Sequence, residues 1–382
     1  MTEFLAAREV AHVAGSTAPR STELVDLAAA TGRTLAADLI ATAPLPGFAA
    51  AAMDGWAVAG DGPWMVGDAI KACDDIPVER LQPGAARPIS TGAPLPSGVA
   101  RVIRSERGEV HGSTLAEVVP DSGLHVRETG EEAARGEVLI QSGVRLSPPR
   151  IALAAAAGYD ALSVITPPTV RLLVLGDEVI DRGSPVPGRV RDVFSPSFPA
   201  LLGELGVLTL GRVGDSLDDT TAAFGAIADP LLVTTGGSAR GPADHVRSSL
   251  TSLGAEMLLD GIRMRPGHPL MLARLPSGTL VLSLPGNPLA AYVGLVAIGG
   301  ALLDGMLARP LAPLARTTLA EAVPGGPATR IVAASRTPAG AVPTGHQGAG
   351  MLRGLAAADL LAVITPSGAA AGDRVEYLPL PW

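Results

Sequence analysis

The chain carries two short apolar runs, each of which ends in a glycine-containing turn. The first is Leu231-Leu232-Val233-Thr234-Thr235-Gly236-Gly237, and the second is Val281-Leu282-Ser283-Leu284-Pro285-Gly286-Asn287-Pro288. A third run, residues 170–175, leads into Gly176-Asp177-Glu178. Apolar runs of this length between breakers are typical of strands buried on both faces of a parallel sheet. Because ligands bind beyond the carboxyl ends of such strands, we expect the three turns to form one anion-binding pocket.

Length and composition narrow the class of protein. The 382 residues are enough for about two to four domains, and the 47% hydrophobic and 17% charged content indicates a globular chain. A net charge of −8 argues against a nucleic-acid-binding surface, which would be basic. The single cysteine, Cys73, excludes an internal disulfide framework and a cysteine cluster for a metal. No uninterrupted apolar run reaches the ~20 residues of a membrane span, so we expect a cytoplasmic protein without a membrane partner.

The first half of the chain divides into two predicted domains. Residues 1–42 and 133–166 form an amino-terminal domain of helices and strands, with a weak helix over 1–15 and a clearer one that starts at Ser21. Residues 43–132 contain short strands separated by Gly and Pro turns, which predicts a β-rich domain inserted into the first.

In the second half of the chain, strand and helix patterns first alternate and then give way to short apolar runs. Over 167–308 this alternation predicts a three-layer α/β domain with a parallel sheet. The expected strands are 170–175, 207–211, 230–235 and 279–284, with two short ones between 257 and 274, and the expected helices lie near 195–205 and at 217–227, 242–253 and 288–307. Residues 309–382 contain only short apolar runs and predict a small carboxy-terminal β barrel or sandwich.

Eight motifs, in order along nearly the whole chain, resemble those of a known family. Residues 44–58, Pro-Leu-Pro-Gly-Phe-Ala-Ala-Ala-Ala-Met-Asp-Gly-Trp-Ala-Val, are similar to the signature of the molybdopterin molybdenumtransferases. This is the MoeA-like family, which includes the E-domain of gephyrin. The other motifs are residues 90–98, 129–132, 176–178, 235–237, 265–269, 284–288 and 344–348.

The resemblance implies a reaction and an assembly. The α/β domain is expected to be similar to the molybdopterin-adenylylating, MogA-like domain, in a four-part subunit of an elongated homodimer. The implied reaction inserts molybdate into adenylylated molybdopterin and releases AMP, with Mg²⁺ as the divalent cation. The active cleft would lie between the α/β domain of one subunit and the β-rich insertion of the other. A molybdopterin adenylyltransferase is the other expected partner.

The turns themselves suit a phosphate cradle. Gly236 and Gly237 let the backbone approach a ligand closely, and Pro285-Gly286-Asn287-Pro288 forms a rigid turn that directs one side-chain amide. Through the resemblance, the cofactor-binding set also includes Thr91, Gly92, Glu178, Thr235 and Asp244. For any one turn, the alternative is an ordinary connection between a strand and a helix.

Carboxylates and arginines supply the expected chemistry. Asp177, Glu178, Asp192 and Asp244 are candidate Mg²⁺ ligands, because hard cations take oxygen donors. The expected catalytic residues are Asp54, Asp177, Asp192 and Arg265. Each aspartate has an alternative role as a turn or helix cap, Asp244 in particular. Arg265, Arg330 and His268 would bind the oxyanion, with His268 in the place of a family lysine.

Several motif positions depart from the family by losing polar side chains. Ala49-Ala50-Ala51 stands where the family has Asp-Asn-Ser, Val174-Leu175 where it has Ser-Thr, and Ala239 and Pro242 also differ. A hydrogen bond to an anion contributes about 1.5–3 kcal/mol, so these losses predict weaker molybdate binding. Besides the molybdenum-inserting enzyme, we therefore consider a catalytically reduced or inactive paralogue that binds molybdopterin or acts as a scaffold. Adenylyl transfer by the α/β domain is a third, lower-ranked reading.

Overall fold

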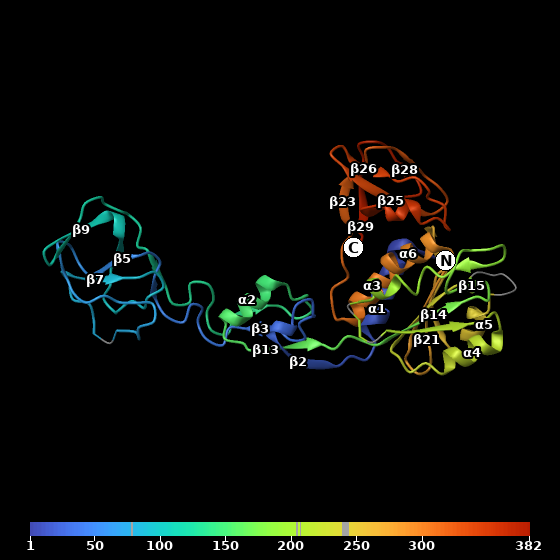
Figure 1. Ribbon diagram of the computed structural model, residues 1–382, viewed down its shortest axis with the longest axis horizontal. Helices are drawn as coiled ribbons and strands as arrows, with labels where there is room; N and C mark the ends of the chain where they lie inside the picture. Colours follow the sequence, from blue (N-terminus) through green and yellow to red (C-terminus); the bar gives the residue numbers. More distant parts are fainter. Residues whose placement is uncertain (78, 204, 207, 239–243) are drawn as a thin grey trace.

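A computed structural model describes residues 1–77, 79–203, 205–206, 208–238 and 244–382. The molecule is elongated, with a strand-rich unit at one end and an α/β unit beside a carboxy-terminal sheet at the other (Figure 1). A narrower unit of strands and one helix joins the two ends. Ala239 and Pro242, together with the predicted start of the helix 242–253, lie outside the described residues.

The α/β unit is built on a six-stranded sheet in the order β17-β14-β18-β22-β21-β19. These strands are Leu208–Val213, Val170–Leu175, Leu231–Thr235, Leu280–Leu284, Met271–Arg274 and Glu256–Asp260. The first four are parallel to one another, β21 runs antiparallel to β22, and β19 pairs antiparallel with β21 and so runs in the same direction as the first four. The predicted strands are therefore present, and the three apolar runs that end in glycine-containing turns form the parallel strands β14, β18 and β22.

Both faces of this sheet are covered, as the unbroken apolar runs predict. Leu172 and Val174 pack on one face with the helices that follow β22, whereas Leu173 and Leu175 pack on the other with Phe224. This alternation arises because successive strand residues point to opposite faces. The three-layer α/β prediction is confirmed.

The helices of this unit differ in length from their predictions. The structure has α3 (Phe198–Leu201), α4 (Leu217–Gly225) and α5 (Val246–Ser252), followed by α6 (Pro288–Gly294), the π-helical segment η3 (Leu295–Gly299) and α7 (Gly300–Met306). The last three form one continuous helix, Pro288–Met306, which is the only helix among the described residues long and apolar enough to cross a membrane. Of its most apolar window, 72% is buried inside the protein. It is the core helix of the α/β unit.

The strand-rich unit at the far end has a six-stranded sheet in the order β8-β5-β7-β6-β10-β9. These strands are Arg101–Arg104, Gly55–Val58, Ala85–Ile89, Trp64–Val66, Thr114–Glu117 and Gly108–His111, and a separate pair joins β4 (Ala50–Ala51) to β11 (Val126–Arg127). Two small apolar clusters fill it, one around Ala57 and Ile89 and one around Trp64 and Leu115. The β-rich content predicted for this stretch is therefore present.

The joining unit corrects one prediction. Residues from Ser21 do not form a helix, because β2 (Thr22–Asp26) pairs antiparallel with β13 (Ala161–Ile165) along its whole length. The helical spacing of Leu24, Leu27 and Ala28 is misleading, since Leu24 is 74% exposed and the pairing with β13 decides the conformation. The unit also contains β3 (Leu39–Ile40), β12 (Val138–Ile140) and α2 (Pro148–Ala156).

The first helix does not pack with this joining unit. Helix α1 (Phe4–Ser16) crosses α7 at two glycines, where a Cβ on Gly15 would lie 2.1 Å from the Leu302 carbonyl oxygen and one on Gly305 would lie 2.1 Å from the His12 carbonyl oxygen. Its buried face, Phe4, Ala7, Ala11 and Ala14, belongs to the core of the α/β unit. The domain bounds 1–42 with 133–166, 43–132, 167–308 and 309–382 stay a prediction.

The carboxy-terminal sheet contains two strands from other parts of the chain. Its order is β1-β20-β25-β27-β29-β23, with β26 beside β25. The strands are Thr2–Glu3, Ile262–Arg265, Thr329–Thr337, Leu360–Ile364, Arg374–Pro379, Ala315–Thr318 and Gly340–Pro343. Strand β20 belongs in sequence to the α/β unit, yet it pairs parallel with β25, which places Arg265 opposite Arg330.

The helix crossing gives a stability prediction. In Gly305→Ala the added methyl group overlaps the backbone of α1, so we expect the free energy of unfolding to fall by about 1–3 kcal/mol. Gly300→Ala is the matched control, because no atom lies within 4 Å of its Cβ position and alanine favours a helix. Calorimetric melting of both variants checks this; equal melting temperatures would contradict the tight crossing.

Candidate functional site

The turns after the parallel strands meet at one edge of the sheet. Gly236 has a φ of +91°, and a Cβ there would lie 2.8 Å from the Leu175 carbonyl oxygen. A Cβ on Gly286 would lie 3.4 Å from the Cα of Gly236. The turn after β22 therefore lies directly against the turn after β18, and the close approach of Gly236 to β14 requires a glycine.

A cavity of about 570 Å³ opens at this edge, and we call it the cradle cavity. Its lining includes Glu178, Arg191, Asp192, Thr235, Gly236, Gly237, Ser238, Asp244, Pro285, Gly286, Asn287, Pro288 and Gly350. It thus brings together the glycine turn, the Pro-Gly-Asn-Pro turn and three of the predicted carboxylates.

One hydroxyl in the cradle cavity lacks a partner. The side chain of Thr235 is buried, and its Oγ1 has no hydrogen-bond partner among the described residues. A buried polar atom without a partner is costly, so it marks a position where a ligand atom would be favoured. Thr234 Oγ1 also lacks a partner, but Thr234 points to the opposite face of the sheet.

A second cavity of about 310 Å³ adjoins the first, and we call it the arginine cavity. It is lined by Arg265, His268, Asn287, Arg330 and Gln347, with prolines 266, 269 and 285 and several small residues. No carboxylate is among its lining residues, which makes it locally positive in an acidic protein. Pro269, Pro285 and Asn287 line both cavities, so the two form one continuous depression.

The two arginines are held by different contacts. Arg330 donates through Nη1 to the Pro324 carbonyl oxygen at 2.7 Å. Arg265 Nη1 lies 3.1 Å from His268 Nδ1. Burial and the positive charge of Arg265 lower the pKa of His268, which keeps the imidazole neutral near pH 7. The predicted oxyanion residues are therefore brought together by the structure.

Asp192 lies in the cradle cavity but is already engaged. Its Oδ1 accepts from the backbone N–H of Phe194 at 2.9 Å and of Ser195 at 3.0 Å, and Arg212 Nη2 lies 3.4 Å from Oδ2. Burial alone raises the pKa of this carboxyl, but the hydrogen bonds from Ser195, Phe194 and Arg212 outweigh it and hold the pKa below its ordinary value. The turn-capping alternative therefore describes Asp192 in this structure.

Asp177 and Glu178 diverge although they are neighbours. Glu178 lines the cradle cavity, with its carboxylate over Gly176. Asp177 lines neither cavity, and its Oδ1 lies beside Gly214. Across the described ranges no group of three or more His, Cys, Asp or Glu side chains is arranged to hold a metal ion.

Asp54, Thr91 and Gly92 lie in the strand-rich unit at the far end of the molecule (Figure 1). There the backbone N–H of Thr91 donates to Asp54 Oδ1 at 2.7 Å. None of the three lines the cradle cavity or the arginine cavity. Within one chain, the structure does not bring these residues to the other predicted site residues.

Among the lining residues that sequence reasoning did not assign to the site are Arg191, Ser238, Gln347 and Gly350. Ser238 follows Gly237, and Arg191 precedes Asp192, so both are adjacent to predicted positions. Gln347 occurs in a quoted motif, and its Nε2 donates to the Ala333 carbonyl oxygen at 2.7 Å, which fixes the loop across the cavity. Gly350 carries no side-chain signal.

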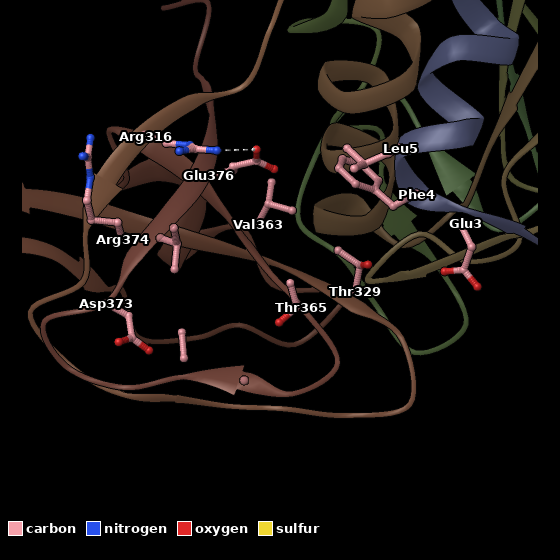
Figure 2. Close-up of a pocket in the computed structure, with 13 residues that line it drawn as sticks. Glu3, Phe4, Leu5, Arg316, Thr329, Val363, Thr365, Asp373, Arg374 and Glu376 are labelled. Carbon is pink, nitrogen blue, oxygen red and sulfur yellow. Dashed lines mark ion pairs between the residues drawn. The ribbon is translucent and has the colours of Figure 1, made fainter.

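A further cavity of about 560 Å³ lies away from these two, between the start of α1 and the carboxy-terminal sheet (Figure 2). Arg316 and Glu376 approach each other to 3.9 Å on its wall. It contains none of the predicted site residues.

Comparisons with known proteins agree along the chain. Residues 3–158 match the MoeA N-terminal region (domain I and II), residues 171–304 a probable molybdopterin binding domain, and residues 319–380 the MoeA C-terminal region (domain IV). Molybdopterin molybdenumtransferase 2 of Mycobacterium tuberculosis is 31% identical over 299 residues, which cover 70% of this chain and 71% of that protein. The molybdopterin molybdenumtransferase of Synechococcus elongatus is 33% identical over 298 residues, with 72% and 73% covered.

A solved structure shows the same fold. The crystal structure of the molybdopterin biosynthesis MoeA protein from Pyrococcus horikoshii OT3 matches all of both chains with a TM-score of 0.81, at 21% identity. The predicted multidomain α/β architecture is thus confirmed, and so is the resemblance drawn from the eight motifs.

The engaged state of Asp192 predicts a stability effect. Asp192→Ala leaves two backbone N–H groups without their acceptor, so we expect a loss of about 1–3 kcal/mol in the free energy of unfolding at pH 7. Because the folded pKa is lowered, this contribution is complete at neutral pH and is lost as the pH falls below about 4. Thermal melting from pH 8 to pH 3 checks it. Asp181→Ala, which removes the exposed partner of Arg212, is the control; equal melting temperatures for the two variants would rule the cap out.

Proposed function

We propose, on the premise that this chain belongs to the molybdopterin molybdenumtransferase family, that it inserts molybdate into adenylylated molybdopterin and releases AMP. The observation that carries the proposal is the pair of adjoining cavities. One offers glycine backbone and carboxylates, and the other offers two arginines with no carboxylate. Such a pair suits a phosphorylated ligand next to a small oxyanion.

The cradle cavity would hold the phosphorylated part of the substrate. The glycine turns let the backbone come close to phosphate oxygens, and the unpartnered Thr235 hydroxyl adds a donor. The arginine cavity would hold molybdate, since a guanidinium presents paired N–H donors that match an oxoanion. Asn287, which lines both cavities, would contact both substrates.

Mg²⁺ would be held chiefly by Glu178 and Asp244. Both line the cradle cavity, whereas Asp177 lies outside it. Two carboxylates fit the preference of Mg²⁺, which is commonly bound by one or two carboxylates together with substrate phosphates and water. When bound, the ion would neutralise phosphate charge during release of AMP.

A homodimer would complete the site. The strand-rich unit, whose strands β5 and β7 are flanked by Asp54 and by Thr91 and Gly92, lies at the far end of the chain from the α/β unit (Figure 1), so their proposed roles require the strand-rich unit of a second copy to reach the cradle cavity. The turn contact between Thr91 N and Asp54 Oδ1 leaves Oδ2 for that purpose. We place this reaction in the cytoplasm, downstream of a molybdopterin adenylyltransferase that supplies the substrate.

The reaction itself is the first test. Purified protein with adenylylated molybdopterin, Mg²⁺ and molybdate should release AMP in a molybdate-dependent way. Arg265→Ala should raise the KM for molybdate at least tenfold, because one of two cations is lost. Arg263→Ala is the matched control on the same strand, where the side chain contacts Glu3 and Pro327 and lines neither cavity. Absence of molybdate-dependent AMP release in the wild type would refute the proposal.

The unpartnered hydroxyls give a second test. Thr235→Val should weaken binding of AMP about tenfold while the melting temperature stays equal or rises, since a buried unpartnered hydroxyl is removed. Thr234→Val should change melting in the same direction without affecting AMP binding. Isothermal titration calorimetry and thermal melting measure the two effects, and equal losses of affinity would contradict the assignment of Thr235.

A second candidate function is a molybdopterin-binding or scaffold protein without turnover. The observation that favours it is that Asp54 and Asp192 both accept backbone hydrogen bonds in turns. This is a structural role, which both residues would keep in a protein without catalytic activity. This candidate predicts calorimetric binding of AMP without molybdate-dependent release. It also predicts that Asp54→Ala still complements a strain deficient in molybdenum insertion.

A further inference from the structure

A histidine and an arginine that line the arginine cavity contact each other. Arg265 Nη1 lies 3.1 Å from His268 Nδ1. A guanidinium has only donors, so Nδ1 must be the acceptor and the ring proton must reside on Nε2. The contact therefore fixes both the tautomer of the imidazole and the direction of the guanidinium.

The surroundings keep this arrangement in place. The backbone carbonyl of His268 accepts from the N–H of Ile262 at 2.9 Å, which ties the residue to the start of β20. The charged side chains that line the arginine cavity with His268 are Arg265, which contacts the ring, and Arg330 from β25. The walls supplied by the 285–290 segment and by residues 347 and 349 carry no charged side chain. A positive charge on the ring, in a cavity that already holds two arginines, is thus disfavoured.

We propose that His268 is a positioning residue: as a neutral Nε2–H imidazole it orients the Arg265 guanidinium toward the oxyanion. The identity of that anion as molybdate rests on the proposed function. A lysine at this position would add charge but could not accept a hydrogen bond from Arg265. In this chain, residue 268 therefore adds no positive charge of its own but holds the guanidinium of Arg265 in one orientation.

The state of the ring is tested without any turnover. Nitrogen-15 NMR of histidine-labelled protein, assigned by loss of one signal in His268→Asn, should show the Nε2–H tautomer at pH 7. The midpoint of its titration should lie below the ordinary histidine value and rise in Arg265→Ala, because the neighbouring cation is removed. An Nδ1–H tautomer in the wild type would overturn the inference, whatever the protein catalyses.

The functional consequence is tested with three substitutions at position 268. In His268→Asn the amide oxygen takes the place of Nδ1, so the KM for molybdate should stay within about twofold of the wild type. His268→Ala and His268→Lys both lack the acceptor, and we expect the KM to rise about fivefold in each with kcat little changed. A lysine variant with a KM equal to or below that of the wild type would show that charge, not orientation, matters here.

A double-mutant cycle separates orientation from direct contact. If His268 acts through Arg265, adding His268→Ala to Arg265→Ala should raise the KM no further. An additive increase would mean that Nε2 binds the anion itself, which would overturn the positioning role. If the wild type releases no AMP, the proposed function fails, while the NMR measurement still decides the proposal for His268.

Discussion

The parallel pairing of β18 with β22 is the constraint on which the candidate site depends. In register, Thr235 lies opposite Leu284, so both strands end at the same level and their turns emerge side by side. Gly286 packs closely against Gly236, which itself must be glycine because of its φ of +91° and because a Cβ there would lie 2.8 Å from the Leu175 carbonyl oxygen. The cradle cavity is the space that these two turns leave beside the end of β14.

The arginine cavity depends on a different pairing, in which one strand changes sheets. Strand β20 follows β19 in the chain but joins β25 of the carboxy-terminal sheet. This pairing places Arg265 beside Arg330, although the two residues are 65 positions apart in the sequence. The turn that follows β20 brings His268 back to Arg265, and Pro269 then forms part of the wall shared by the two cavities.

The sequence predicts what depends on periodicity and turn chemistry. Runs such as 170–175 and 231–235 have one strongly favoured placement, in the middle of a covered parallel sheet, and the turns after them necessarily share an edge. The motif resemblance adds the family and, through it, the arginines. Packing between distant segments is not readable in this way. The strand at Thr22–Asp26 is determined by β13, more than 130 residues later, and α1 is held by close contact of Gly15 with α7.

The roles of individual carboxylates are equally hard to predict, because the sequence does not show which hydrogen bonds each carboxylate accepts. Asp54 stands in the 44–58 motif and Asp192 is a candidate Mg²⁺ ligand, yet both accept hydrogen bonds from the backbone, Asp54 from Thr91 and Asp192 from Phe194 and Ser195. Asp177 and Glu178 are adjacent, but only Glu178 lines the cavity. The difference lies in which loop each carboxylate meets, namely Gly214 for Asp177 and Gly176 for Glu178.

The exchange of β20 between sheets has a mechanical consequence. Arg265 and Arg330 lie opposite each other on the paired strands β20 and β25, whereas the glycine turns belong to the other sheet. A rotation of the carboxy-terminal sheet would move both guanidinium groups together, because they lie on paired strands, and would leave the distance between them unchanged. Such a rotation would instead change the distance between the two guanidinium groups and the proline and glycine turns on the opposite side of the cavities.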